Sequence, residues 1–164
     1  MDDPLDPGRT VDRLPDGAAL ARWAEFVGLE IRSHVTDETA AEVRGLREHI
    51  YRVVHPLAVG AEPVAADVTR LHRQLLDGLG RAEVTSLMPL ELAAANLPDE
   101  LALAAWRLLE GEDARRLRQC RASDCGWLFL DRTKNRSRVW CSSADCGNRT
   151  RARRHYARRT TEQR

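Results

Sequence analysis

All four cysteines of this chain lie in one short segment, and no other sequence feature constrains the fold as strongly. They form two pairs with equal internal spacing, Cys120-x4-Cys125 and Cys141-x4-Cys146, and fifteen residues separate the pairs. Two short loops joined by a hairpin-length spacer place four thiolates at the corners of a tetrahedron, the geometry that Zn²⁺ takes in structural sites. The spacing therefore predicts one structural Zn²⁺ per chain, and iron in place of zinc stays open.

Other interpretations of the cysteines fit less well. Disulfides would need an oxidising compartment, and no signal-peptide core follows Met1. An iron–sulfur cluster also takes four cysteines, but this spacing matches neither common ferredoxin pattern. Because four thiolates fill the tetrahedral shell and leave no position for water, we expect no catalytic role for the metal. No Ser-His-Asp order, phosphate loop or paired carboxylate motif stands out in the sequence, so we expect no enzyme activity.

The spacer between the two pairs has the pattern of a β-hairpin. Residues 127–130 are apolar and predict a strand, residues 131–135 are polar and predict a turn, and residues 138–140 predict the returning strand. Glycine follows the second cysteine of each pair, at Gly126 and Gly147, where it lets the backbone turn near the sulfur atoms.

A strongly basic segment follows Cys146 and is predicted to be helical. At 100° per residue, Ala152 and Tyr156 share one face. We expect this face to pack on the finger, with Trp127 or Trp140 beneath it.

The arginines of this helix divide between two faces. Arg151, Arg154 and Arg158 gather opposite the packing face, where guanidinium groups can bind phosphate or guanine edges. Arg149 lies beside the metal loop on the packing side, so we expect a mixed role that favours structure. The predicted nucleic-acid-binding residues are Arg149, Arg151, Arg153, Arg154 and Arg158 in the helix, with Arg136 and Arg138 in the spacer.

The charge of the chain is divided between its N-terminal and C-terminal parts. Residues 115–164 carry 15 basic and 4 acidic side chains, a net charge of +11, whereas residues 1–114 carry 11 basic and 21 acidic side chains, a net charge of −10. Such a basic segment predicts a polyanionic partner. The partner is DNA in one interpretation. The alternatives are an acidic protein surface, which would make the chain an adaptor, and RNA.

Residues 1–114 have the periodicity of helices. Apolar positions predict four helices, over about residues 16–27, 36–57, 63–79 and 98–111. Asp16 can cap the first helix; Thr36 begins the second without a capping-box acid, and Gly78 and Gly80 are expected to end the third. Residues 84–92 predict a short strand or a hairpin. The buried faces are expected to include Leu20, Trp23, Val27, Val43, Leu46, Ile50, Val53, Val54, Leu57, Val68, Leu71, Leu75, Leu79, Leu101, Ala105, Leu108 and Leu109.

Charge and residue type both change near residues 111–115, which predicts a domain boundary there. We expect a flexible tail over residues 1–14, a helical domain over residues 15–113, and a zinc finger with its basic helix over residues 114–160. No apolar run is long enough to span a membrane, so we expect a cytoplasmic protein.

The finger resembles a known family. The run Cys146-Gly147-Asn148-Arg149, with the other three cysteines, is similar to the CGNR zinc finger over about residues 117–159. Further matching positions are Gly126, Trp127, Asp131, Asn135, Arg136, Trp140 and Tyr156. The preceding part, with its Trp23 helix and the run Leu46-Arg47-Glu48-x-Ile50-Tyr51, resembles the ABATE domain that precedes this finger in bacterial proteins described as stress-induced transcription regulators.

The resemblance implies a zinc-dependent DNA-binding transcription regulator and favours DNA over RNA. Its N-terminal domain would be a sensor or a dimeriser, so a homodimer and a small-molecule effector are further expectations. Family members begin with an apolar strand containing an Asn-Thr pair, whereas residues 1–11 here are polar and Pro-rich. We expect a mainly α protein: a helical domain with a short hairpin, and a treble-clef-like four-cysteine zinc finger with a β-hairpin and a C-terminal basic helix.

Overall fold

The computed structural model describes residues 2–3, 6–10, 12–29 and 34–162 of the 164-residue chain. It divides into two compact units, one of residues 12–114 and one of residues 115–164 with the N-terminal residues up to 11. The mainly α architecture that the sequence predicts is confirmed.

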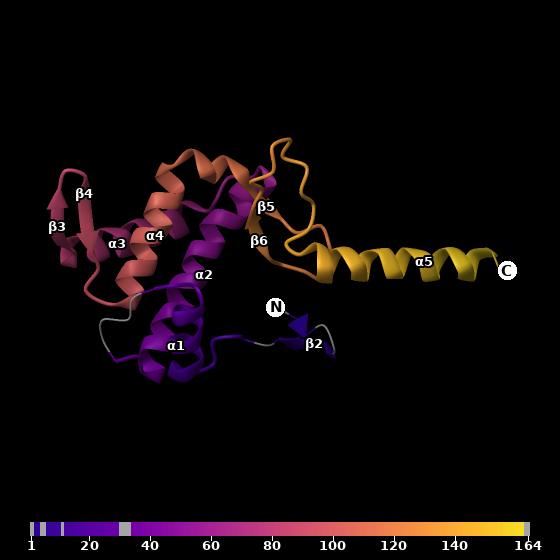
Figure 1. Cartoon of the computed structure of the whole chain (residues 1–164), viewed down its shortest axis with the longest axis horizontal. Helices are drawn as coiled ribbons and strands as arrows, with labels where there is room; N and C mark the ends of the chain where they lie inside the picture. The colour runs from indigo at the N-terminus through magenta and orange to yellow at the C-terminus, as the bar shows by residue number, and fades with distance from the viewer. Residues whose placement is uncertain (1, 4–5, 11, 30–33, 163–164) are drawn as a thin grey trace. The chain divides into compact units, whose positions relative to one another are not determined.

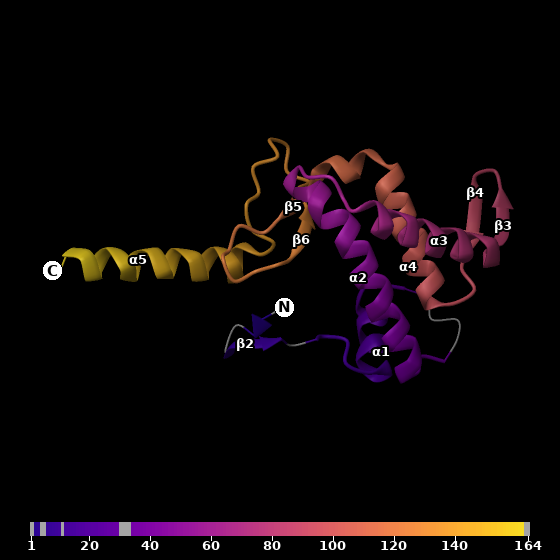
Figure 2. The same ribbon diagram turned by 180° about the vertical axis from the view of Figure 1, so that it is seen from behind.

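The helical unit contains four α-helices and one hairpin (Figure 1). Its elements are α1 (Gly17–Phe26), α2 (Asp37–Val59), α3 (Ala65–Arg81), β3 (Glu83–Leu87), β4 (Leu90–Ala93) and α4 (Leu97–Glu110), followed by the 3₁₀ turn η1 (Glu112–Arg116). In both views the β3–β4 hairpin stands at the end of the unit where α3 finishes (Figures 1 and 2). The predicted hairpin at residues 84–92 is therefore present, with its turn at Met88–Pro89.

The other unit holds the cysteine segment. Its elements are β1 (Asp2–Asp3), β2 (Asp6–Thr10), β5 (Leu117–Gln119), β6 (Leu128–Leu130), the π-helical turn η2 (Ser143–Gly147) and α5 (Asn148–Glu162). Strands β1 and β2 form a short antiparallel pair. The predicted flexible tail covers these strands, includes residues 1, 4–5 and 11 outside the described ones, and stays a prediction.

Side-chain caps fix where two helices begin. The Ala19 amide donates to Asp16 Oδ1 at 2.7 Å, as the sequence predicts. At the start of α2 the Thr39 amide donates to Thr36 Oγ1 at 3.1 Å, and the Thr36 amide donates to Thr39 Oγ1 at 3.3 Å. A threonine hydroxyl thus closes the capping box in place of the missing acid.

Two apolar clusters form the core of the helical unit, and α4 contributes to both. The first joins α1 and α2 to the start of α4, and the second joins α2 and α3 to its middle. Most of the predicted buried positions lie in them. Val27, Leu57, Val68 and Leu79 are instead 41–45% exposed, because they lie at helix ends or at the margin of the buried face.

The predicted end of α3 was wrong. Gly78 is buried inside the helix, where a Cβ would meet the Ala102 side chain at 3.4 Å, and α3 continues to Arg81. Close packing on α4 therefore outweighs the low helix propensity of glycine. The Arg81 guanidinium donates to both carboxylate oxygens of Asp99, at 2.5 and 2.9 Å, and so neutralises a carboxylate that is only 3% exposed.

We predict opposite effects for two glycine-to-alanine changes. A Cβ at Gly17 would lie 2.6–2.9 Å from backbone atoms of Val35 and Thr36, which cannot move aside easily. Gly17→Ala should therefore lower the free energy of unfolding by about 1–3 kcal/mol. Gly45 lies within α2 with nothing within 4 Å, so Gly45→Ala should raise it by about 0.5–1 kcal/mol. Urea unfolding followed by helical circular dichroism measures both, and equal effects would contradict the packing at Gly17.

Candidate metal centre and nucleic-acid interface

The first cysteine pair lies in the loop of a short hairpin. Strand β5 runs antiparallel to β6, with Cys120 directly after β5 and Cys125 shortly before β6. The Cys120 amide donates to the Trp127 carbonyl at 2.9 Å, and the Cys125 amide donates to the Ala122 carbonyl at 3.0 Å. These bonds form a tight knuckle that presents both thiols on one side.

The sequence predicts that the strand over residues 127–130 pairs with residues 138–140, and this pairing was wrong. Residues 138–140 form no strand, and β6 pairs with residues that precede the first cysteine. The Val139 carbonyl accepts one bond, from the Arg121 amide at 3.1 Å. Because β5 has only three residues and only Leu117 of them is buried, it carries little strand signal in the sequence.

The second cysteine pair lies where α5 begins. Cys141 precedes η2 and Cys146 lies within it, so η2 passes directly into α5. The Asp145 amide donates to Ser142 Oγ at 3.1 Å, which caps this turn. Gly147 is buried against Trp140, whose Cδ1 would lie 3.2 Å from an added Cβ, so a larger residue would crowd the metal loop. A knuckle facing a helix start is the treble-clef-like arrangement predicted.

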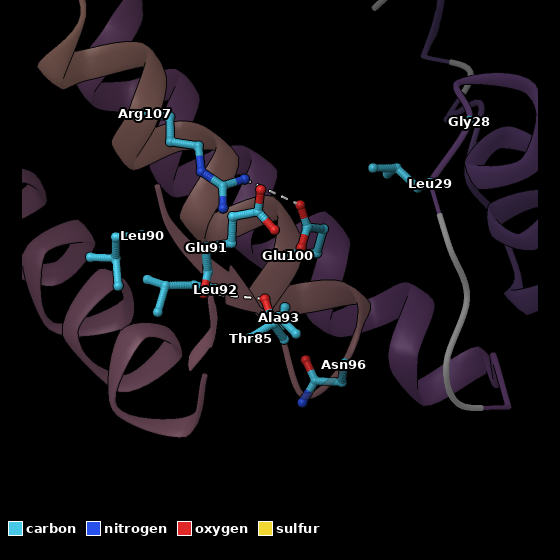
Figure 3. A pocket seen from close by; sticks show the side chains of 11 residues that line it. Gly28, Leu29, Thr85, Leu90, Glu91, Leu92, Ala93, Asn96, Glu100 and Arg107 are labelled. Atoms are coloured by element: carbon cyan, nitrogen blue, oxygen red, sulfur yellow. Dashed lines mark hydrogen bonds and ion pairs between the residues drawn. The ribbon is translucent and has the colours of Figure 1, made fainter. Parts of the chain in front are cut away.

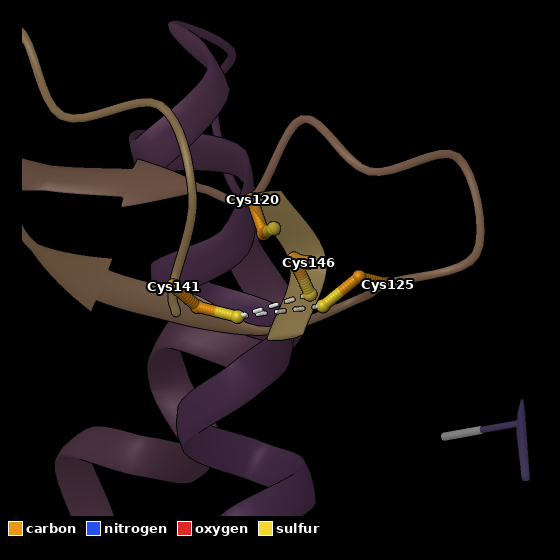
Figure 4. A group of neighbouring side chains, drawn as sticks. All are labelled: Cys120, Cys125, Cys141 and Cys146. Carbon is orange, nitrogen blue, oxygen red and sulfur yellow. Dashed lines mark hydrogen bonds between the residues drawn. The ribbon is translucent and has the colours of Figure 1, made fainter. Parts of the chain in front are cut away.

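The four sulfur atoms converge on a common centre (Figure 4). All lie within 4.8 Å of one another, and Cys141 Sγ is 3.7 Å from Cys125 Sγ and 3.6 Å from Cys146 Sγ. A tetrahedron with Zn–S distances of roughly 2.3 Å has edges of roughly 3.8 Å, so the cluster has the size that Zn²⁺ requires. The residues present therefore fit one structural Zn²⁺, held by Cys120, Cys125, Cys141 and Cys146.

Without a metal, the thiolate form is disfavoured at two of the four cysteines. Burial raises the pKa of Cys125 to about 11, and burial together with the neighbouring thiols raises the pKa of Cys141. Burial also opposes ionisation of Cys120, but hydrogen bonds from backbone amides and from the neighbouring thiols together outweigh it and lower the pKa of that thiol. Zn²⁺ binding must therefore displace protons, and the metal supplies stability that this small apolar cluster lacks.

Asp124, beside the second cysteine, ties α5 to the knuckle. Its carboxylate lies 2.9 Å from Arg149 Nε and 2.9 Å from a terminal nitrogen of Arg153. Burial opposes its ionisation, but the hydrogen bonds from Arg153 and Arg149 hold the pKa of Asp124 below its ordinary value. Arg149 also donates to Cys146 Sγ at 3.4 Å. We call this group, Asp124 with Arg149 and Arg153, the Asp124 clamp.

Asp131 organises the loop between the cysteine pairs. It is fully buried and accepts from Thr133 Oγ1 at 2.5 Å and from the Thr133 and Arg138 amides at 3.0 Å. The hydrogen bond from the Thr133 hydroxyl is the main reason that the pKa of Asp131 is lowered. Arg136 takes the left-handed conformation at φ 50°, and Arg138 folds back to donate to the Trp140 and Cys141 carbonyls.

The predicted packing face of α5 was wrong. Tyr156 is 68% exposed and Ala152 is exposed, so neither anchors the helix. The Asp124 clamp performs that role, and Trp140 packs with the cysteines instead. The helical wheel places charged side chains close to the predicted apolar face, but it cannot reveal that Asp124 meets them. Arg151 donates to Asn148 Oδ1 at 2.5 Å, and the side chains of Arg154 and Arg158 are exposed.

The helical unit contains an open cavity of about 560 Å³. Hairpin and α4 residues line it, and Glu91 and Glu100 lie beside Arg107 (Figure 3). Glu100 pairs with Arg107 at 3.5 Å, which leaves one carboxylate in excess. Polar groups meet here, but none of them identifies a ligand.

Two family models match the chain. The CGNR zinc finger matches residues 116–159, and the ABATE model, described as "Putative stress-induced transcription regulator", matches residues 3–112. The chain belongs to the ABATE family. Its C-terminal unit is a CGNR zinc finger, and both resemblances seen in the sequence are thereby confirmed. A search of curated proteins gave no match. Among the described residues of this ABATE-family protein, no helix is long and apolar enough to cross a membrane.

We predict that zinc is required for the CGNR finger but not for the helices of the ABATE unit, which have their own core. Cys146→Ser should reduce zinc from about one equivalent to less than half, because a tetrahedral site loses one ligand. Ser143→Ala, in the same turn but exposed, is the matched control. Elemental analysis measures the metal and circular dichroism the helices. Loss of all helical signal in Cys146→Ser would instead make the two units one cooperative structure.

We predict that Arg149 stabilises the finger of this ABATE-family protein. Arg149→Ala leaves Asp124 with one partner and should cost about 1–3 kcal/mol, so zinc should pass faster to a competing chelator. Arg154→Ala removes an equal charge from an exposed site and should stay within about 0.5 kcal/mol of the parent. Equal rates of zinc loss for the two variants would show that the clamp has no stabilising role.

Proposed function

We propose that this protein is a DNA-binding transcription regulator that contacts DNA with one face of α5. The observation that carries the proposal is the Asp124 clamp, which holds the Arg149 and Arg153 side of α5 against the finger. Arg151, Arg154 and Arg158 start from positions about half a helical turn away from that side. We call these three residues the outer ridge.

The chemistry of the outer ridge suits a phosphate backbone. Guanidinium groups bind phosphate bidentately and can also read the edge of guanine. The net charge of +11 over residues 115–164 adds attraction that does not depend on sequence. The exposed loop side chains of Arg132, Lys134 and Arg136 extend this positive charge beyond the helix.

The seven arginines predicted to bind nucleic acid then have different proposed roles. Arg149, Arg153 and Arg138 hold carboxylates or carbonyls of the finger, so their proposed contribution to DNA binding is indirect. The outer ridge and Arg136 are proposed to contact DNA directly. The Asn148 contact fixes Arg151 near the helix start, where backbone amides also attract phosphate.

The metal and the ABATE unit are proposed to support this function. Zinc would act only as a structural ion, because four thiolates leave no open coordination position. The ABATE unit is proposed to sense an effector or to dimerise, and its cavity is a candidate effector site. A cytoplasmic location suits thiols that must stay reduced to bind zinc.

We predict that the triple change of Arg151, Arg154 and Arg158 to Ala strongly weakens DNA binding without loss of zinc. Each lost phosphate contact should reduce the slope of log affinity against log salt by about 0.9. The matched control changes Arg22, Arg70 and Arg73 to Ala, which removes three exposed positive charges from the helical unit. The measurement is a titration with duplex DNA at several salt concentrations, repeated with a scrambled duplex and with RNA.

Three outcomes would contradict the proposal in different ways. An unchanged affinity and slope in the ridge variant would mean that the ridge is only solvated. An equal loss in the control variant would mean that only total charge matters. No binding to any duplex would favour the adaptor, and a preference for RNA would favour the accessory factor.

A further inference from the structure

One face of the β3–β4 hairpin is apolar. Leu90 and Leu92 are two residues apart in β4, so their side chains lie on one face. Their cross-strand partners Leu87 and Val84 lie on the same face, because the register of β3 is irregular between Val84 and Ser86. Leu90 and Leu92 point to the same side, whereas Glu91 between them points toward Arg107 (Figure 3). We call the surface formed by Val84, Leu87, Met88, Leu90 and Leu92 the hairpin face.

The hairpin face is too exposed to belong to the core. Val84, Leu87, Met88 and Leu90 are 57%, 78%, 93% and 63% exposed. Together they expose on the order of 500 Å² of mainly apolar surface, near the upper end for the largest patch on a monomer. The sheet contains only these two strands in the described part of the chain, so each also has an unpaired edge.

We propose that the hairpin face is a homodimer contact, which binds the same face of a second copy about a two-fold axis. A two-fold contact brings identical residues together, so it tolerates no strong net charge. The residues 1–114 carry a net charge of −10, which opposes most contacts between two copies. The two acidic residues of the hairpin strands, Glu83 and Glu91, alternate with Val84, Leu90 and Leu92 and so lie on the other side of the sheet.

The area of the hairpin face fits contact with a second copy of the chain. A standard interface buries about 800 Å² on each partner. The hairpin face supplies more than half of that area. Helix α3, which leads into β3, also exposes Leu76 and Leu79, at 49% and 41%. The adaptable Met88 side chain at the turn suits a packed contact between two copies.

The dimer contact would strengthen the proposed DNA binding. Only this biological role of the contact rests on the proposed function. Each chain carries one outer ridge, whereas a dimer carries two related by symmetry. Two linked binding sites raise affinity for a duplex with two half-sites without any new contact to a single half-site.

Sedimentation analysis of the full-length, zinc-loaded chain tests the contact. The parent should show a reversible dimer, and the double variant Leu87→Glu/Met88→Glu should raise its dissociation constant more than about tenfold. Leu90→Glu, on the other strand, should act in the same direction. The control Phe26→Glu/Val59→Glu replaces two other exposed apolar residues, 88% and 51% exposed, with the same charge and should leave the dimer unchanged. Zinc content and helical circular dichroism verify that each variant is folded.

A parent chain that stays monomeric at about 100 μM overturns the inference. So does a dimer that survives both hairpin variants, or one that the control variant dissociates equally. Titration with one-site and two-site duplexes separates this inference from the proposed function. A dimer that binds no duplex refutes DNA binding alone, whereas a monomeric parent that binds both duplexes refutes the hairpin contact alone.

Discussion

Tetrahedral coordination by four thiolates is the constraint on which the C-terminal unit depends. The cluster around Cys120 and Cys146 contains few apolar side chains, so the metal must replace a conventional core. It joins the β5–β6 knuckle to the start of α5, and this junction sets where the basic helix begins. The carboxylates of Asp124 and Asp131 stabilise the finger where apolar packing is scarce, since each accepts hydrogen bonds from two or more donors.

The helical unit rests on a different principle. Its two apolar clusters share α4, and small residues let the helices approach closely where they cross. Gly17 meets the backbone before α2, and Gly78 meets α4. The deeply buried carboxylate of Asp99 is paired by an arginine at the end of α3. Because this unit keeps its own core, the metal and the helices can be perturbed separately.

The sequence was informative wherever a pattern is local. The cysteine spacing, the Asp16 cap and the helix periodicities each depend on neighbouring residues. Each correctly predicted a feature of the structure: the four-sulfur cluster, the start of α1 and the four helices. The failures concern contacts between segments distant in the chain. Glycine disfavours a helix in isolation, yet packing on α4 keeps Gly78 helical, and a strand as short as β5 has no visible periodicity. The Asp124 clamp joins residues 25 apart, so the wheel of α5 alone assigned Tyr156 to the wrong role.

The anchoring of α5 at one end has a thermodynamic consequence. The clamp reaches only its first two turns, and beyond it the helix carries arginines at exposed positions with no apolar cluster beneath them among the described residues. A helix of 15 residues without tertiary support is marginal in water, and like charges one turn apart weaken it further. Counterions relieve that repulsion, so the helix–coil equilibrium of its distal turns shifts toward helix as ionic strength rises. A polyanion does the same locally, and part of its binding free energy is then spent on ordering the helix that it contacts.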